Sequence, residues 1–350
     1  MRTVLLVASL LAVAPLTAAP VPKSIKGPGV IYIWTNSQPP VLNLYTPDGE
    51  HIKEVKLDTK KECKIIDVSP GGKFVVVTSE DGKLNPAGGI EDTLVHLVPL
   101  GDAEGELPEP IIRGRCPTLR WSTDGRTAYI TLEAGVERFG HRGRRYLTSV
   151  IEYDTVSERK RALDLGDGHE VLDVSADGRE LLTTTRVFDP GEDKHEFAHI
   201  VQVGTGECQP LYEAGEIHVH SFHPDGKRVF AIRVETPKVG GGKINPRLEY
   251  IILDLETGES APLEWEATLK MATRKGETSR WSVSPDRKRV VVKWTEQMRV
   301  PVEGRDWEWR WVDRLGVCDL NGRNFKAFVT VPQRVIGWPQ ETGISGFAWR

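Results

Sequence analysis

Short runs of alternating apolar and polar residues follow one another along most of the chain, and turns rich in Gly, Pro and Asp separate them. Alternation of this kind predicts β-strands that bury one face on a core. The clearest case is residues 222–230, where a Pro-Asp-Gly turn joins two apolar strand ends. Pro224 presets φ, Asp225 can bond its own backbone and Gly226 accepts positive φ, so the segment predicts a tight turn between two strands.

This strand–turn–strand pattern recurs along the chain, so it is a repeat unit and not a site. The turn position falls at residues 72, 125, 178, 226 and 287, and each repeat closes with a further strand and a short turn, as in residues 251–259. A period of about fifty residues with β-type patterning predicts one four-stranded blade per repeat. Each blade then has strands A to D, a short A–B turn and a variable B–C loop.

The two ends of the chain complement each other. Residues 30–57 hold three expected strands without a strand A, and residues 344–350 hold one strand in which Phe347 and Trp349 match the spacing of Leu119 and Trp121. The C-terminal strand is therefore expected to complete the first blade and to remove an open sheet edge. The expected fold is a single all-β domain over residues 24–350, a six-bladed β-propeller of four-stranded antiparallel blades.

The repeat motifs resemble the WD40-like, PD40-type repeats of TolB-like six-bladed β-propellers over nearly all of the mature chain. The sequence departs from that pattern where Gly71 replaces the turn Asp, Thr123 and Ala176 replace Pro, and Arg287 replaces Gly. Known members of the family work in envelope protein complexes. The resemblance thus implies an exported scaffold that binds a protein or another envelope component.

The first 19 residues have the pattern of a signal peptide. Arg2 supplies a positive charge, residues 4–14 are apolar apart from Ser9, and residues 17–19 are small enough for cleavage. A short membrane anchor is the alternative, but the apolar stretch is too short to span a bilayer comfortably. Pro20 gives a poor cleavage context. We expect export to the periplasm or the extracellular space.

Composition and motifs narrow the function. The 350 residues carry a formal net charge of −4, which does not suggest nucleic-acid binding. The sequence contains no G-x-S-x-G, H-E-x-x-H, P-loop or dinucleotide-binding motif. A non-enzymatic, monomeric binding scaffold is therefore the first expectation.

One set of residues supports a different function. Cys63, Cys116 and His169 lie nine residues before the turn position in three successive repeats, and His218 lies beside the equivalent position of the next. On innermost strands they would approach the mouth of the central channel, where thiolates and imidazoles suit one divalent metal ion. The alternative function is a metal-dependent hydrolase or lyase. A Cys63–Cys116 disulfide and simple packing of small side chains are the other interpretations.

A second equivalent set is Asp67, Arg120 and Asp173, on the same strands. Alternating charges on neighbouring blades predict an ion pair between blades, and a ligand clamp is the less favoured interpretation.

The B–C loops vary most and are expected on one face of the ring, at residues 79–91, 133–146, 186–196, 234–247 and 296–306. Long loops on a rigid scaffold are where binding is expected. Two loops carry the candidate binding residues, Arg138, His141, Arg142, Arg144 and Arg145 in one and Lys238 and Lys243 in the other. The first set would attract an acidic partner. Trp307, Trp309 and Trp311 alternate on one strand, either as blade packing or as an exposed patch for a protein or glycan.

Overall fold

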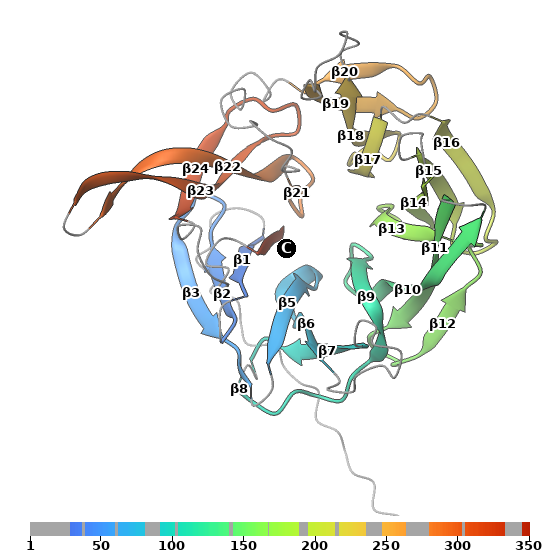
Figure 1. The fold of residues 1–350 in the computed structure, drawn as a ribbon, viewed down its shortest axis with the longest axis horizontal. Helices are drawn as coiled ribbons and strands as arrows, with labels where there is room; N and C mark the ends of the chain where they lie inside the picture. The colour runs from blue at the N-terminus through green and yellow to red at the C-terminus, as the bar shows by residue number, and fades with distance from the viewer. Residues whose placement is uncertain are drawn as a thin grey trace, which may run out of the picture.

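The strands are arranged as blades around a central axis, with β5, β9, β13, β17 and β21 nearest to it (Figure 1). The structure is a computed structural model, and it describes residues 29–36, 39–59, 62–80, 92–101, 104–139, 143–166, 168–188, 195–213, 217–235, 247–263, 280–302, 305–332 and 345–350. The chain is a β-propeller built of antiparallel sheets.

The first sheet joins the two ends of the described chain. Its strands, in order across the sheet, are β25 (Gly346–Trp349), β1 (Ile31–Thr35), β2 (Val41–Tyr45) and β3 (His51–Lys56). Ile31 is in register with Trp349, and Trp34 with Gly346. The prediction that the C-terminal strand completes the N-terminal sheet is confirmed.

The largest sheet has eleven strands. They are β5 (Cys63–Val68), β6 (Phe74–Glu80), β7 (Thr93–Pro99), β9 (Ile112–Trp121), β10 (Thr127–Phe139), β11 (Gly143–Asp154), β12 (Lys160–Leu163), β13 (His169–Val174), β14 (Glu180–Phe188), β15 (His195–Gln202) and β16 (Cys208–Glu213). Two further sheets have four strands each. They are β17 (Ile217–Phe222), β18 (Arg228–Glu235), β19 (Arg247–Asp254) and β20 (Ser260–Pro262), and then β21 (Arg280–Val283), β22 (Arg289–Val302), β23 (Arg305–Asp319) and β24 (Lys326–Pro332). β4 (Asp58–Thr59) and β8 (Glu104–Gly105) form a small parallel pair, and η1 (Pro70–Gly72) is a 3-10 turn.

The sequence predicts six separate blades, but the described strands do not form six separate sheets. The described strands form four sheets of four or more strands, because two junctions fuse strand sets into the largest one. β9 pairs with β7 before Cys116 and with β10 from Arg115 onward, and it bends at Cys116, where φ is 44°. The second junction pairs Arg144 and Arg145 of β11 with β14. Both junctions depend on contacts between repeats, which the repeat pattern alone does not contain.

Strand β1 buries side chains on both faces of its sheet, each face against a neighbouring sheet. Tyr32 and Trp34 pack toward the cluster that contains β5 and β6, whereas Ile31 and Ile33 pack toward β22 and β23. All four side chains are at most 4% exposed. Burial of one such side chain stabilises the fold by about 1.5–3 kcal/mol. This explains why the strand reads as a continuous apolar run.

Two of the five expected B–C loops are strand and not loop. β10 continues to Phe139 and β11 begins at Gly143, while β22 continues to Val302 and β23 begins at Arg305. They form long hairpins, and the β22–β23 hairpin projects beyond the ring (Figure 1). Their charged and aromatic residues alternate along the sequence, as a strand pattern requires. Residues 81–91, 189–194 and 236–246 of the other loops lie outside the described residues.

The expected signal peptide, residues 1–19, also lies outside the described residues. In the described part of the chain, no helix has the length and apolar character that crossing a membrane would need.

Candidate functional site

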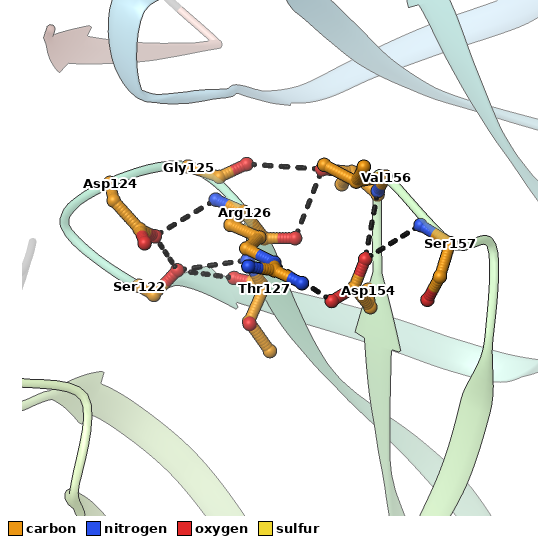
Figure 2. A network of polar contacts seen from close by, with 9 residues as sticks. Ser122, Asp124, Gly125, Arg126, Thr127, Asp154, Val156 and Ser157 are labelled. Carbon is orange, nitrogen blue, oxygen red and sulfur yellow. Dashed lines mark hydrogen bonds and ion pairs between the residues drawn. The ribbon is translucent and has the colours of Figure 1, made fainter.

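The A–B turns repeat one hydrogen-bonded design, which Figure 2 shows for residues 122–127. The Ser122 hydroxyl donates to Asp124 Oδ1 at 2.6 Å and accepts from the Thr127 backbone N–H at 2.9 Å, and the Arg126 N–H donates to the same Asp124 oxygen at 2.9 Å. The hydrogen bond from Ser122, with that of the Arg126 N–H, lowers the pKa of Asp124. The same hydroxyl-to-carboxylate bond joins Ser175 to Asp177 and Ser284 to Asp286. Three of the A–B turns therefore share one hydrogen-bond pattern, while Ser69 and His223 occupy the serine position in two others.

The C–D turns lie at the same end of the ring as the A–B turns. Asp154 Oδ1 accepts backbone N–H groups of Val156 and Ser157, and Arg126 Nε donates to Asp154 Oδ2 at 3.0 Å (Figure 2). The Ser157 N–H contributes most to lowering the pKa of Asp154 to about 2. We call this end the turn end. Because strands B and C run away from it, the B–C connections lie at the opposite end, which we call the hairpin end.

The innermost strands have backbone N–H and C=O groups that strand B does not pair. Each has one edge paired with strand B and one edge toward the axis, where its backbone groups need other partners. A side chain of the neighbouring innermost strand supplies them: Arg120 Nε donates to the Leu172 carbonyl at 2.6 Å, and the Phe222 N–H donates to Asp173 Oδ2 at 2.8 Å. Arg120 and Asp173 are the penultimate residues of β9 and β13.

The same position is used further round the ring. Ser221, penultimate in β17, accepts from Trp281 Nε1 at 3.0 Å, and Ser282, penultimate in β21, accepts from the Trp349 N–H at 3.0 Å. Sequence reasoning missed these two serines because they carry no charge. They occupy the same penultimate position of the innermost strand as Arg120 and Asp173, and this equivalence in the repeat could have identified them.

The predicted ion pairs among Asp67, Arg120 and Asp173 take a different form. Asp67 pairs with Arg350 at 3.2 Å, while Arg120 and Asp173 bond to backbone groups of the next strand. The exposed surface of Asp173 is intermediate, but many protein atoms surround its carboxyl group. This burial raises the pKa of the carboxyl, and hydrogen bonds from the Val174 and Phe222 N–H groups oppose the shift. The position therefore connects neighbouring blades, as expected, mainly through backbone groups.

The four cysteines are free thiols, so the structure does not form the Cys63–Cys116 disulfide. Cys63 is buried and its sulfur lies 3.3 Å from Thr59 Oγ1, which fits the packing interpretation. Burial raises the pKa of Cys63, and burial with a hydrogen bond to Glu133 raises that of Cys116. Burial thus disfavours the thiolate form of both side chains.

The predicted metal ligands lie on four strands. His169 begins β13, is buried and bonds through Nδ1 to Thr183 Oγ1 at 2.9 Å, while Cys63 begins β5, Cys116 lies at the bend of β9 and His218 is in β17. Within the described ranges no three or more His, Cys, Asp or Glu side chains come together as a metal site would require. The structure does not bring Cys63, Cys116, His169 and His218 into one coordination set.

Three of the basic candidates, Arg138, Arg144 and Arg145, lie in the β10–β11 hairpin. Arg138 lies near the end of β10, directly opposite Arg144 of β11, and the next row pairs Glu137 with Arg145. His141, Arg142, Lys238 and Lys243 lie outside the described residues. The register thus brings Arg138 and Arg144 together.

The tryptophans of β23 also lie in a hairpin extension. Trp309 is in register with Arg299 and Trp311 with Gln297, whereas the pairing of β22 with β21 ends at Lys293 and that of β23 with β24 begins at Val312. These rows therefore belong to the two-stranded part of the hairpin, beyond the four-stranded sheet.

Comparisons with known proteins bear on the fold. No protein-family model matches the chain, and no characterised protein is found to be similar in sequence. Similar solved structures include a putative TolB from Agrobacterium tumefaciens, with 13% identity over 87% of this chain and 90% of that one and a TM-score of 0.49. The β-propeller domain of the Trilobed protease from Pyrococcus furiosus has 14% identity over 87% and 95%, with a TM-score of 0.47.

An oligogalacturonate lyase in complex with manganese is a third similar structure, with 11% identity over 87% of this chain and 75% of that one and a TM-score of 0.44. The structural neighbours thus include TolB-like β-propeller proteins beside a protease domain and a lyase. At such low similarity they say nothing about activity, and the assignment of the fold depends on the strand pairing and the ring of Figure 1.

Proposed function

We propose that this chain is an exported, non-enzymatic β-propeller scaffold that binds a protein or another envelope component through its hairpin end. The observation that carries the proposal is the difference between the two ends of the ring. At the turn end, three of the A–B turns share one short hydrogen-bonded design. The described strands that lead to the hairpin end differ in length: β10, β11, β22 and β23 have 12 to 15 residues each, whereas β14, β15, β18 and β19 have eight or nine. Specific recognition needs such individual shape.

We further propose that the ring has six blades. The eleven-stranded sheet contains three successive strand sets, which begin at β5, β9 and β13. The first set takes the start of β9 as its outer strand, through Ile112–Gly114, before β9 bends at Cys116. With the three separate four-stranded sheets, this count gives six.

Two polar side chains of the innermost strands bond to backbone groups of the next strand, Arg120 to the Leu172 carbonyl and Asp173 to the Phe222 N–H. Within the described residues, Cys63, Cys116, His169 and His218 do not come together as a metal site would require. The metal-dependent hydrolase or lyase is therefore the less supported function.

Site-specific photo-cross-linking tests the binding end. A benzophenone amino acid is introduced at Ala134 or Arg299, both exposed at the hairpin end, and at Arg179 or Lys227, both exposed at the turn end. In cells that make the full chain, the hairpin-end variants should cross-link to the same discrete partner and the turn-end variants should not. Cross-links only from the turn end would reverse the assignment.

Export is tested separately. The N-terminal sequence of protein recovered from the periplasm or medium should begin close to residue 20, as cleavage of the proposed signal peptide requires. Size-exclusion with light scattering should give the mass of a monomer.

A further inference from the structure

One A–B turn carries a histidine where the others carry a serine. In the turn between β17 and β18, His223 takes the position that Ser122, Ser175 and Ser284 hold in three other turns. Its Nδ1 lies 3.0 Å from Asp225 Oδ1, the carboxylate oxygen to which the serine hydroxyl donates in those turns. A hydroxyl stays neutral near pH 7, whereas an imidazole changes its charge between about pH 5 and 8. This turn therefore has a contact that can titrate in place of one that cannot.

The ring of His223 is packed into the interface between two blades. Its side chain is 8% exposed, and its ring centroid lies 5.2 Å from that of Phe230, a core residue of β18. Phe230 contacts Trp281 of β21 in turn, at 6.1 Å between ring centroids, and both belong to the cluster that joins β18 and β19 to β21–β24. A positive charge on the imidazole would thus lie among apolar groups, where it is poorly solvated.

The A–B turn of the neighbouring blade departs from the repeat at a different position. Arg287, between β21 and β22, stands where the other four turns have glycine, and it adopts a positive φ of 58°. This conformation is strained for a residue with a side chain. The side chain makes a contact that glycine could not make, because its Nη1 donates a hydrogen bond to the Pro224 carbonyl at 3.3 Å. The two unusual turns are therefore joined through Arg287 and the residue that follows His223.

The charges in its own turn act on His223 in opposite directions. Burial has the largest effect and lowers the pKa of His223, while Asp225 raises this pKa and Arg228 lowers it. Although burial opposes ionisation of Asp225, hydrogen bonds from the Lys227 N–H and from Arg228 lower the pKa of its carboxyl to about 2. Asp225 is therefore ionised throughout the range in which an imidazole titrates, and Arg228 Nε already donates to its second oxygen at 2.6 Å.

The elements packed beside the ring add three further titratable or charged groups. Asp286 accepts a hydrogen bond within its own turn, Arg287 is bound to the turn of His223, and His220 packs on Trp281 at 4.7 Å between ring centroids. Among these described contacts, the one that reaches the turn of His223 comes from a cation. A protonated His223 would therefore enter a turn to which Arg287 already brings positive charge.

We propose that His223 and Arg287 form an acid-sensitive latch between these two blades at the turn end. In the closed form the neutral ring packs on Phe230, and Arg287 holds the Pro224 carbonyl. A ring that takes up a proton gains solvation by leaving the interface, and it moves the adjoining Pro224 away from Arg287. Because the folded-state pKa of His223 lies below the ordinary 6.5, the closed form is fully favoured above pH 6.5 and is lost as pH falls toward the folded pKa.

Hydrogen exchange of the full chain, read by mass spectrometry at pH 7 and pH 5, measures the opening of each turn. After correction for the intrinsic effect of pH on exchange, peptides that cover residues 217–230 and 281–289 should lose protection in acid. The loss is at most about tenfold per pH unit, the limit for one proton. A peptide over residues 119–127, which contains a serine turn, is the internal reference and should keep its protection.

Two variants use residues that the repeat itself accepts, so both should fold. His223→Ser gives this turn the hydroxyl of the other turns and should abolish the acid response of both peptides. Arg287→Gly gives the neighbouring turn its usual glycine and should abolish the response of residues 281–289 while that of residues 217–230 remains. His51→Ser, which removes a histidine from an exposed position, is the matched control and should respond as the native chain does.

NMR of the histidine rings checks the proton itself. The signal of His223, assigned by its loss in His223→Ser, should titrate below pH 6.5, and titration at or above that value would overturn the inference. Three exchange results would also overturn it. They are an acid response that persists in His223→Ser, an equal loss of protection in the reference peptide, and an undiminished response of residues 281–289 in Arg287→Gly. The latch does not depend on the proposed function, because none of these measurements needs a partner.

Discussion

Arg350 donates a hydrogen bond from Nε to the carbonyl oxygen of Val68 at 2.8 Å, and its guanidinium group also pairs with the carboxylate of Asp67 at 3.2 Å. Arg350 and Val68 are 282 residues apart in the sequence. This contact connects the residue after β25 to the innermost strand β5, and it complements the backbone pairing of β25 with β1. The first sheet and β5 are thus joined by a charged group and not only by apolar packing.

Arg350→Ala should therefore destabilise the fold by about 1–3 kcal/mol, because it leaves the Val68 carbonyl and the buried Asp67 carboxylate without this donor. Urea unfolding of the full chain measures the change. The control is Arg161→Ala, which removes an exposed ion pair with Glu152 and should cost less than about 1 kcal/mol. Equal effects of the two variants would contradict a special role for Arg350.

Gly346→Ala should be strongly destabilising for a steric reason. A Cβ at Gly346 would lie 2.3 Å from the ring of Trp34, its register partner across β25 and β1. Overpacking of this kind costs about 1–3 kcal/mol. Gly204→Ala is the matched control, since a Cβ there has nothing within 4 Å, and it should leave Tm nearly unchanged. Restoration of Tm by Trp34→Leu in the Gly346→Ala background would assign the loss to this contact.

Asp173→Ala should cost about 1–3 kcal/mol, because the Phe222 N–H of the next innermost strand loses its acceptor. Asp173→Asn keeps an acceptor oxygen and avoids the cost of a buried charge, so it should cost less. Denaturant unfolding distinguishes them, and a smaller loss for alanine than for asparagine would mean that the hydrogen bond between β13 and β17 does not matter.

Two histidines should make the fold sensitive to mild acid. Burial lowers the pKa of His199 and of His223 below the ordinary 6.5, and for His223 the nearby Asp225 opposes the shift only in part. The unfolded chain then binds protons more readily than the folded chain. The free energy of unfolding should therefore fall as pH decreases through 6.5 toward the folded pKa, by at most about 1.4 kcal/mol per pH unit for each histidine.

Unfolding of His199→Gln between pH 7 and 5 tests this coupling. The variant should show a shallower loss of stability over that range than the native chain, whereas His51→Gln, at an exposed position, should keep the native slope. Identical slopes for all three proteins would show that burial of His199 does not control its protonation.

Thiol titration should divide the cysteines by burial. Cys116 and Cys208 are exposed and should react with a colorimetric disulfide reagent in the native protein, while Cys63 and Cys318 are buried and should react only after unfolding. Burial raises the pKa of Cys318 to about 12, which further suppresses its thiolate. No native reaction at Cys116, in mass spectrometry of labelled peptides, would show that its thiol is not free.

The sequence was most informative where structure is local. The turns around residues 125, 178 and 226 and the pairing of Phe347 and Trp349 with β1 follow from alternation and turn chemistry. The bend at Cys116 does not, because a non-glycine residue with φ of 44° before Pro117 is held by pairing on both sides. Such a bend needs the neighbouring sheets already in place.

The candidate site was less predictable. Charge content made residues 133–146 look like a loop, although the same residues alternate as strand, and only the register shows that Arg138 faces Arg144. The metal set failed for a related reason. Equal offset from the turn places Cys63 and Cys116 on equivalent strands, but equivalence around a ring does not imply proximity, and the two differ in burial.

Pairing of β25 with β1 also has a kinetic consequence. The Asn36 N–H donates to Ser345 Oγ across 309 residues, so the first sheet is finished only after nearly all of the described chain is available. Contacts of such long range form late and slow folding. Until then the inner edge of β1 is open to other strands. A chain stalled or truncated before Gly346 should therefore be a substrate for holding chaperones or a seed for aggregation.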